Sequence, residues 1–186
     1  MRERFLELLG SVNRPCMDKL TKWLTENSDF MTAPASTKYH GAVESGLLVH
    51  SVAVFDRLLD VLVMNPTIKV DPESARICGL LHDICKVNFY KKSERNAKDE
   101  KGNWVKVPFY EIEDKFPYGH GEKSVYILNE FIHLSVEEAM AIRWHMSAWN
   151  ATEYGERAAL SSAMEKYPLI LALSTADQMA TFWDKK

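Results

Sequence analysis

The stretch GLLHDICKV at residues 79–87 places a histidine and an aspartate side by side in an otherwise apolar run. A buried aspartate is rare and unfavourable unless it is paired or bound to a metal. The pattern predicts a helix over about 72–85, which puts His82 and Asp83 at its C-terminal end. The helix dipole favours cations at that end, so the carboxylate needs another source of stabilisation. Any fold of this chain must either expose the pair to water or place a partner beside it.

Most of the chain is predicted to be helical. Residues 1–37 hold two short helices and a polar connector, and the other helices lie in 38–183 of a predicted single domain, 1–186. Apolar spacing predicts these helices at about 41–64, 72–85, 119–133, 135–148 and 167–183, with a loop and a short helix in 149–166. Asp71-Pro72 is typical of a helix start, and Ser135 with Glu138 of a capping box. β-Branched and aromatic residues on both sides of the charged turn SERNAKDEKGN predict a β-hairpin at about 86–113.

Further polar side chains fall on faces that are predicted to be buried. His50 lies within an apolar stripe of the 41–64 helix, formed by Val43, Leu47, Val54, Leu58 and Val61. Asp177 lies on the stripe of Ile170, Leu173 and Ala180 in the last helix. A lone inward histidine is more often a hydrogen-bonded core residue than a ligand, but three inward polar sites on three helices are harder to explain that way. His120 at a helix start and His145 in an apolar run are further candidates, whereas His133 is interpreted as structural.

Composition restricts the class of protein. The 186 residues carry a net charge of −3, so bulk charge gives no reason to expect nucleic-acid or membrane binding. The N-terminal segment lacks the apolar stretch of a secretion signal, and no segment approaches the roughly 18 apolar residues that span a bilayer. Cys16, Cys78 and Cys85 form no zinc-binding pattern, and their odd number fits a reducing compartment. We therefore expect a cytoplasmic protein with no membrane partner and leave its oligomeric state open.

The ordered set His50, His82-Asp83 and Asp177 resembles the metal-ligand pattern of the HD-domain superfamily of metal-dependent phosphohydrolases, over residues 38–183. His120 and His145 match the subset of that superfamily that holds two metals. The stretches KYHGAVESGLLVHS and LLHDICKV are also similar to the HD part of a bacterial 3′–5′ exoribonuclease, and the chain resembles small stand-alone HD proteins of bacteria and phages. The resemblance implies a mostly α fold, a compact HD-domain helical bundle with the hairpin as an insertion. Cys85 departs from the glycine of many members and is not expected to be a ligand.

The resemblance also implies the chemistry of the site. His50, His82, Asp83 and Asp177 would hold one ion, and His120 and His145 a second, with Asp83 as the bridge. Imidazole and carboxylate ligands suit Mn, Fe, Co, Ni or Zn, and two such ions lower the pKa of a shared water. Asp83 and Lys86 are the expected catalytic residues. Lys86 would also bind a phosphate oxygen, or would simply complement a helix dipole. His40 is a candidate for substrate binding, although its role is open.

The expected substrate is a small phosphate compound: a nucleotide, a cyclic nucleotide or a short single-stranded oligonucleotide. Between residues 86 and 106 there are seven Lys/Arg and three acidic residues, which could guide an anion or could simply be a solvated hairpin. Two other functions fit the same ligands: a di-iron oxygenase, and a non-catalytic module that binds a nucleotide or a partner. Oxygen consumption with a mixed-valence iron signal would identify the oxygenase. The complete ligand set argues against the non-catalytic module.

Overall fold

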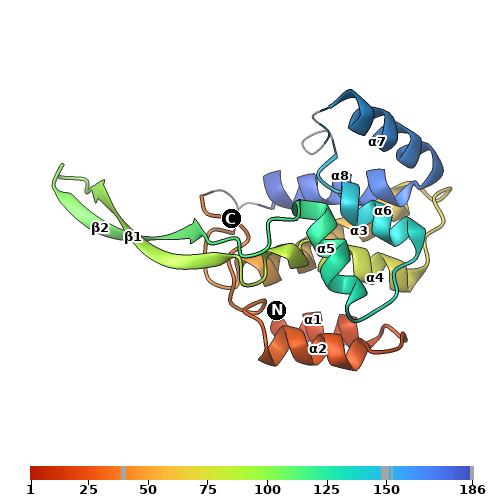
Figure 1. Ribbon diagram of the computed structural model, residues 1–186, viewed down its shortest axis with the longest axis horizontal. Helices are drawn as coiled ribbons and strands as arrows, with labels where there is room; N and C mark the ends of the chain where they lie inside the picture. The colour runs from red at the N-terminus through yellow and green to blue at the C-terminus, as the bar shows by residue number, and fades with distance from the viewer. Residues whose placement is uncertain (39–40, 148–150, 152, 185–186) are drawn as a thin grey trace.

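The computed structural model describes residues 1–38, 41–147, 151 and 153–184. Helices dominate it, and one antiparallel hairpin extends away from them as an arm (Figure 1). The expected fold class, mostly α with a hairpin insertion, is confirmed. The elements in chain order are α1 (Arg2–Gly10), α2 (Met17–Glu26), α3 (Gly46–Met64), α4 (Pro72–Leu81), the 3-10 helix η1 (Ile84–Lys86), β1 (Tyr90–Lys98), β2 (Trp104–Ile112), α5 (His120–Asn129), α6 (Val136–Trp144), α7 (Tyr154–Lys166) and α8 (Leu169–Phe182).

Helix α3 lies at the centre and packs against α4 and α8. Its expected stripe is buried from Leu47 onward, with His50 within it at 6% exposure. Val43 is an exception, because it is 63% exposed and precedes the helix. The helix starts at Gly46 rather than near 41, since Ser45 has a positive φ of 62° and a Cβ on Gly46 would lie 2.0 Å from the Gly41 carbonyl oxygen. The chain therefore folds tightly back on itself just before α3.

Helix α4 begins as predicted, with the Asp71 carboxylate accepting hydrogen bonds from two backbone N–H groups of the first turn. It ends at Leu81 rather than near 85, which corrects the expected boundary. His82 is the C-cap, and Asp83 opens the short helix η1 that follows. The break between the two helices places the His-Asp pair at the junction of α4 and η1 instead of on a continuous helix face.

The hairpin lies within the expected range, over 90–112, but its turn is shorter than expected. Strands β1 and β2 pair from Tyr90 with Ile112 to Lys98 with Trp104, so most of the predicted charged turn belongs to β1. Asp99 closes the actual turn by accepting hydrogen bonds from the N–H groups of residues 101 and 103. No residue of either strand is buried. A two-stranded hairpin has little stability by itself, so the base of the arm depends on the helical body.

The C-terminal half follows the prediction with shifted ends. Helix α5 ends at Asn129 and α6 at Trp144, earlier than expected, and the predicted capping box of Ser135 and Glu138 is present. The expected loop with a short helix is wrong in extent, because α7 has 13 residues and is capped by Glu153 and Glu156. None of the helices in the described ranges has the length and apolar character needed to cross a membrane.

The N-terminal helices are fixed to the body by a buried carboxylate. Glu138 in α6 is fully buried, and its two oxygens accept hydrogen bonds from the Arg14 guanidinium at 2.8 and 2.5 Å. The Ser74 hydroxyl donates to the same carboxylate at 2.6 Å. Burial alone would raise the pKa of Glu138, but the Arg14 and Ser74 hydrogen bonds hold it below its usual value. The loop between α1 and α2 is thus joined to both α4 and α6.

Candidate metal centre

Six of the predicted site residues converge from separate elements on one buried point. They come from the middle of α3, the end of α4, the start of η1, the start of α5, the end of α6 and α8, and are respectively His50, His82, Asp83, His120, His145 and Asp177. His82, Asp83 and His145 are at most 2% exposed. The bundle thus assembles a set of side chains that are far apart in sequence.

One oxygen of the Asp83 carboxylate faces two histidines. Asp83 Oδ1 lies 2.8 Å from His120 Nε2 and 3.5 Å from His145 Nε2. The two imidazole nitrogens are 3.1 Å apart. These three atoms belong to the residues that the family resemblance implies as ligands of the second ion.

The other Asp83 oxygen faces the remaining group. Asp83 Oδ2 lies 3.5 Å from His50 Nε2 and 3.6 Å from His82 Nε2. His50 Nε2 is in turn 3.1 Å from Asp177 Oδ1. Asp83 therefore stands between two sets of donors, the position expected of a bridging carboxylate. The donor atoms of His50, His82 and Asp177 lie within 4.8 Å of one another, which is close enough for one metal ion.

The rings of His82 and His145 are each held by the same kind of backbone contact. Each residue directly follows its helix, and its Nδ1 lies within hydrogen-bond distance of the backbone carbonyl three residues earlier: Gly79 at 3.0 Å and Ile142 at 2.6 Å. A carbonyl only accepts, so these contacts place the proton on Nδ1 and leave a lone pair on Nε2. Metal-binding histidines generally have such an acceptor behind the ring.

Two glycines allow the elements to approach each other. A Cβ on Gly121, beside His120, would lie 2.1 Å from the Arg143 carbonyl oxygen in α6. A Cβ on Gly79 would lie 2.8 Å from Phe55 Cα in α3. Any side chain at either position would separate α5 from α6, or α4 from α3, and would draw the histidines apart.

Two buried polar atoms of the site have no hydrogen bond within the described part of the chain: His82 Nε2 and Asp83 Oδ1. His120 Nε2 approaches Asp83 Oδ1 to 2.8 Å, but outside the geometry of a hydrogen bond. An unsatisfied buried nitrogen and an unsatisfied buried carboxylate oxygen are unfavourable in a folded protein. A divalent cation would satisfy both, so the residues present fit a metal.

The protonation states also suit a cation. Burial lowers the pKa of His82 to about 3, so its ring is neutral. Burial alone would raise the pKa of Asp83, but Lys86 above all and then the neighbouring histidines hold it well below its usual value. For Asp177, contact with His50 likewise outweighs burial and lowers the pKa. Neutral imidazoles and ionised carboxylates are the forms that bind metals. His120 differs, because burial alone would lower its pKa but Cys85 and Asp83 raise it to about 10, so its ring must release a proton to bind a cation.

A cavity of about 330 Å³ opens onto the site. Five predicted residues line it: Asp83, Lys86, His120, His145 and Asp177. Lys86 Nζ donates to Asp83 Oδ2 at 2.6 Å and has 14% of its side chain exposed. The remaining wall comes from the loop before α3, the base of the hairpin, the residues after α6 and the end of α8, and consists of Ala35, Ser36, Thr37, Tyr90, Ile112, Met146, Gln178, Thr181 and Phe182. The space next to the proposed ligands therefore has a largely apolar wall with a few polar groups and the Lys86 cation.

The other predictions have different outcomes. His40 lies outside the described residues. His133 is exposed within the connection between α5 and α6, as expected of a residue with no part in the site. The sequence interpretation missed Gln178 and Thr181, although they follow Asp177 by one residue and by one helical turn. It also missed Cys85 as a neighbour of His120, because nothing in the sequence indicates that contact.

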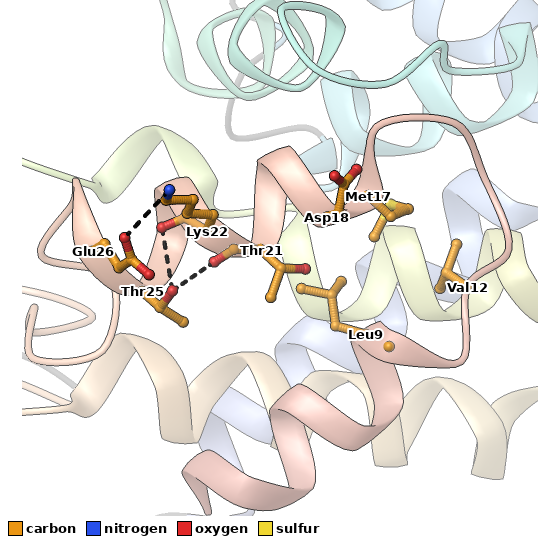
Figure 2. A pocket seen from close by; sticks show the side chains of 9 residues that line it. Leu9, Val12, Met17, Asp18, Thr21, Lys22, Thr25 and Glu26 are labelled. Carbon is orange, nitrogen blue, oxygen red and sulfur yellow. Dashed lines mark hydrogen bonds and ion pairs between the residues drawn. The ribbon is translucent and has the colours of Figure 1, made fainter.

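A separate cavity of about 570 Å³ lies between α1 and α2 (Figure 2). It has an apolar wall that includes Leu9 and Met17, and a polar wall along α2. The Thr25 hydroxyl donates to the Thr21 carbonyl at 2.9 Å, and Lys22 pairs with Glu26 at 3.9 Å. Its lining contains no histidine or cysteine, so it offers no comparable metal-ligand set.

Comparison with protein-family models matches residues 47–181 to the HD domain. No solved structure matches the chain significantly. The matched range covers most of the chain and contains all six converging residues. Members of this family are generally metal-dependent hydrolases that bind divalent metals. The chain thus belongs to the HD domain family.

Proposed function

We propose that this protein is a metal-dependent phosphohydrolase that acts on a nucleotide, a cyclic nucleotide or a short oligonucleotide. The observation that carries the proposal is the buried cluster of histidines and carboxylates around Asp83. It lies next to a cavity that also contains Lys86. A cavity of this size is at the small end of known ligand sites, which favours a compact phosphate ester.

The distances support two ion positions that share Asp83. His50, His82 and Asp177 would complete one, and His120 and His145 the other. This nitrogen and oxygen donor set suits Mn, Fe, Co, Ni or Zn better than Mg or Ca. Such ions, when bound, act as Lewis acids toward phosphoryl oxygens and lower the pKa of water.

Lys86 would contact the substrate phosphate. Its amine lines the cavity, and although burial opposes the charge, Asp83 raises its pKa so that it stays cationic. A fixed cation there would stabilise the charge that develops on phosphoryl oxygens. Tyr90 beside it donates a hydrogen bond to the Ala35 carbonyl at 3.3 Å, and burial raises its pKa to about 12. Tyr90 therefore supplies shape and a neutral hydroxyl rather than a base.

The hairpin supports a nucleic-acid substrate. Tyr90 and Ile112 are paired at its base and both line the cavity. Alternation along the strands puts four further pairs on the same face: Lys92 with Tyr110, Glu94 with Pro108, Asn96 with Lys106, and Lys98 with Trp104. Lys98 Nζ lies 5.4 Å from the Trp104 ring centre. Aromatic rings that stack on bases and cations that attract phosphates are the usual means of binding single strands, so a short strand could extend from the cavity along the arm.

The test combines metal analysis with an activity screen. The purified chain is analysed for bound metal and then assayed, with added Mn²⁺, on nucleotides, cyclic dinucleotides and short RNA. We expect hydrolysis of at least one class and its loss in Asp83→Ala, with His133→Ala as a control. Hydrolysis that persists in Asp83→Ala would refute the proposal. Oxygen consumption by the iron-loaded chain without hydrolysis would identify the oxygenase instead.

A further inference from the structure

His120 differs from the other two terminal histidines of the site in what lies behind its ring. His82 and His145 follow their helices and contact the carbonyl of their own last turn. His120 is the first residue of α5, and residues 117–119 before it are not helical, so no preceding helical turn offers an acceptor. Its Nδ1 lies instead 3.3 Å from the sulfur of Cys85.

We propose that Cys85 is a positioning residue for the second metal ion: its sulfur accepts a hydrogen bond from His120 Nδ1 and turns Nε2 toward the ion position beside Asp83 and His145. The inference rests on the metal-dependent function proposed above. If Nε2 is to bind a cation, the ring proton must be on Nδ1, and that proton needs an acceptor. A thiol sulfur is a weak acceptor, but it is in the required place.

The surroundings of Cys85 fix the sulfur in this position. Cys85 is 3% exposed in η1, and its backbone N–H donates to the Ser124 hydroxyl at 3.2 Å. Ser124 is fully buried in α5, the helix that begins with His120. Cys85 and His120 are therefore held to the same helix and cannot drift apart independently. The close approach of Gly121 to α6 keeps the start of α5 near His145, whose Nε2 is 3.1 Å from that of His120.

A competing explanation is that the sulfur itself binds the metal. The donor atoms of Asp83, Cys85 and His120 lie within 4.8 Å of one another, which is near enough for one ion. In the described geometry the sulfur faces Nδ1, whereas Nε2 faces Asp83 and His145. The two roles make different spectroscopic predictions, since only a ligand gives a sulfur-to-metal charge-transfer band.

The experiment titrates the full-length metal-free protein with Co²⁺, in wild type, Cys85→Ala and Cys85→Ser. Cys78→Ala is the matched control, because Cys78 is also a buried thiol but is absent from the donor groups of the site. We expect the affinity for the second ion to fall about 10- to 100-fold in Cys85→Ala, as on loss of other partners behind metal ligands, and less in Cys85→Ser. The first ion and the melting temperature should change little.

Proton NMR of the cobalt-loaded protein gives a second readout, which a purely structural role would not affect. Each histidine that binds through Nε2 shows a shifted, exchangeable Nδ1–H signal, and we expect the His120 signal to exchange faster in Cys85→Ala while that of His145 is unchanged. Unaltered affinity and exchange would overturn the inference, and so would a wild type that binds one ion only. A charge-transfer band that disappears with Cys85 would also overturn it, because the sulfur would then be a ligand. Since no phosphate substrate is used, failure of the hydrolase proposal would show separately, as metal binding without hydrolysis.

Discussion

Gly121→Ala tests whether the approach of α5 to α6 builds the metal centre. The new Cβ would lie 2.1 Å from the Arg143 carbonyl oxygen, whereas ordinary contact begins at 3.4 Å. Both partners are helix backbone, so the helices must separate by about 1.3 Å, the difference between those two distances. The separation acts directly on the 3.1 Å spacing between His120 and His145. Overpacking of this kind destabilises a protein by about 1–3 kcal/mol.

The site should lose more than the fold does. A misplacement of about 1 Å at a reactive centre lowers rates by about 100-fold, so we expect a loss of that order in hydrolysis and weaker binding of the ion held by His120 and His145. Gly155→Ala is the matched control: a Cβ there meets nothing within 4 Å, and alanine favours the helix by up to about 1 kcal/mol. Calorimetric metal titration and thermal unfolding measure both effects. Wild-type binding of two ions by Gly121→Ala would refute the reasoning.

Three further predictions concern stability, catalysis and substrate. The lowered pKa of Glu138 means that its ionised form contributes stability that is present above the usual pKa of 4.5 and is lost as pH falls through the lower folded-state value. Glu138→Gln should therefore lower the unfolding free energy by about 1.5–3 kcal/mol at pH 7, by removing the buried carboxylate that pairs with Arg14, and should flatten the acid limb of denaturant titrations. Lys86→Met should reduce kcat by about 100- to 1000-fold while calorimetry still shows metal binding; an unchanged kcat would contradict the role of Lys86. Trp104→Ala should weaken short RNA binding about 5- to 150-fold in fluorescence anisotropy, with Val105→Ala on the opposite face as control, and equal affinities would exclude the arm as a binding surface.

Local sequence patterns predicted the helices well where apolar residues recur with a helical period and form a face that is buried. The apolar stripes of α3 and α8 are buried around His50 and Asp177, and the caps of α4 and α6 form as their residue types indicate. The ends of elements were less predictable, because a boundary depends on contacts that periodicity does not contain. Helix α3 starts late since Ser45 adopts a left-handed conformation beside a tight backbone contact at Gly46. The hairpin turn was placed too early because charged residues in β1 were interpreted as a loop.

The sequence alone determined which side chains are candidates for the site, because histidine and aspartate on otherwise apolar faces are unfavourable without a partner. Only the tertiary structure decided that Asp83 directs one oxygen to His50 and His82 and the other to His120 and His145, since those distances depend on how four helices pack. The tertiary structure also places the Cys85 sulfur beside the His120 ring. The chain reverses between η1 and α5, with the whole hairpin between them, so the sulfur meets a ring 35 positions away. Contacts of that separation are set by packing, which no local pattern encodes.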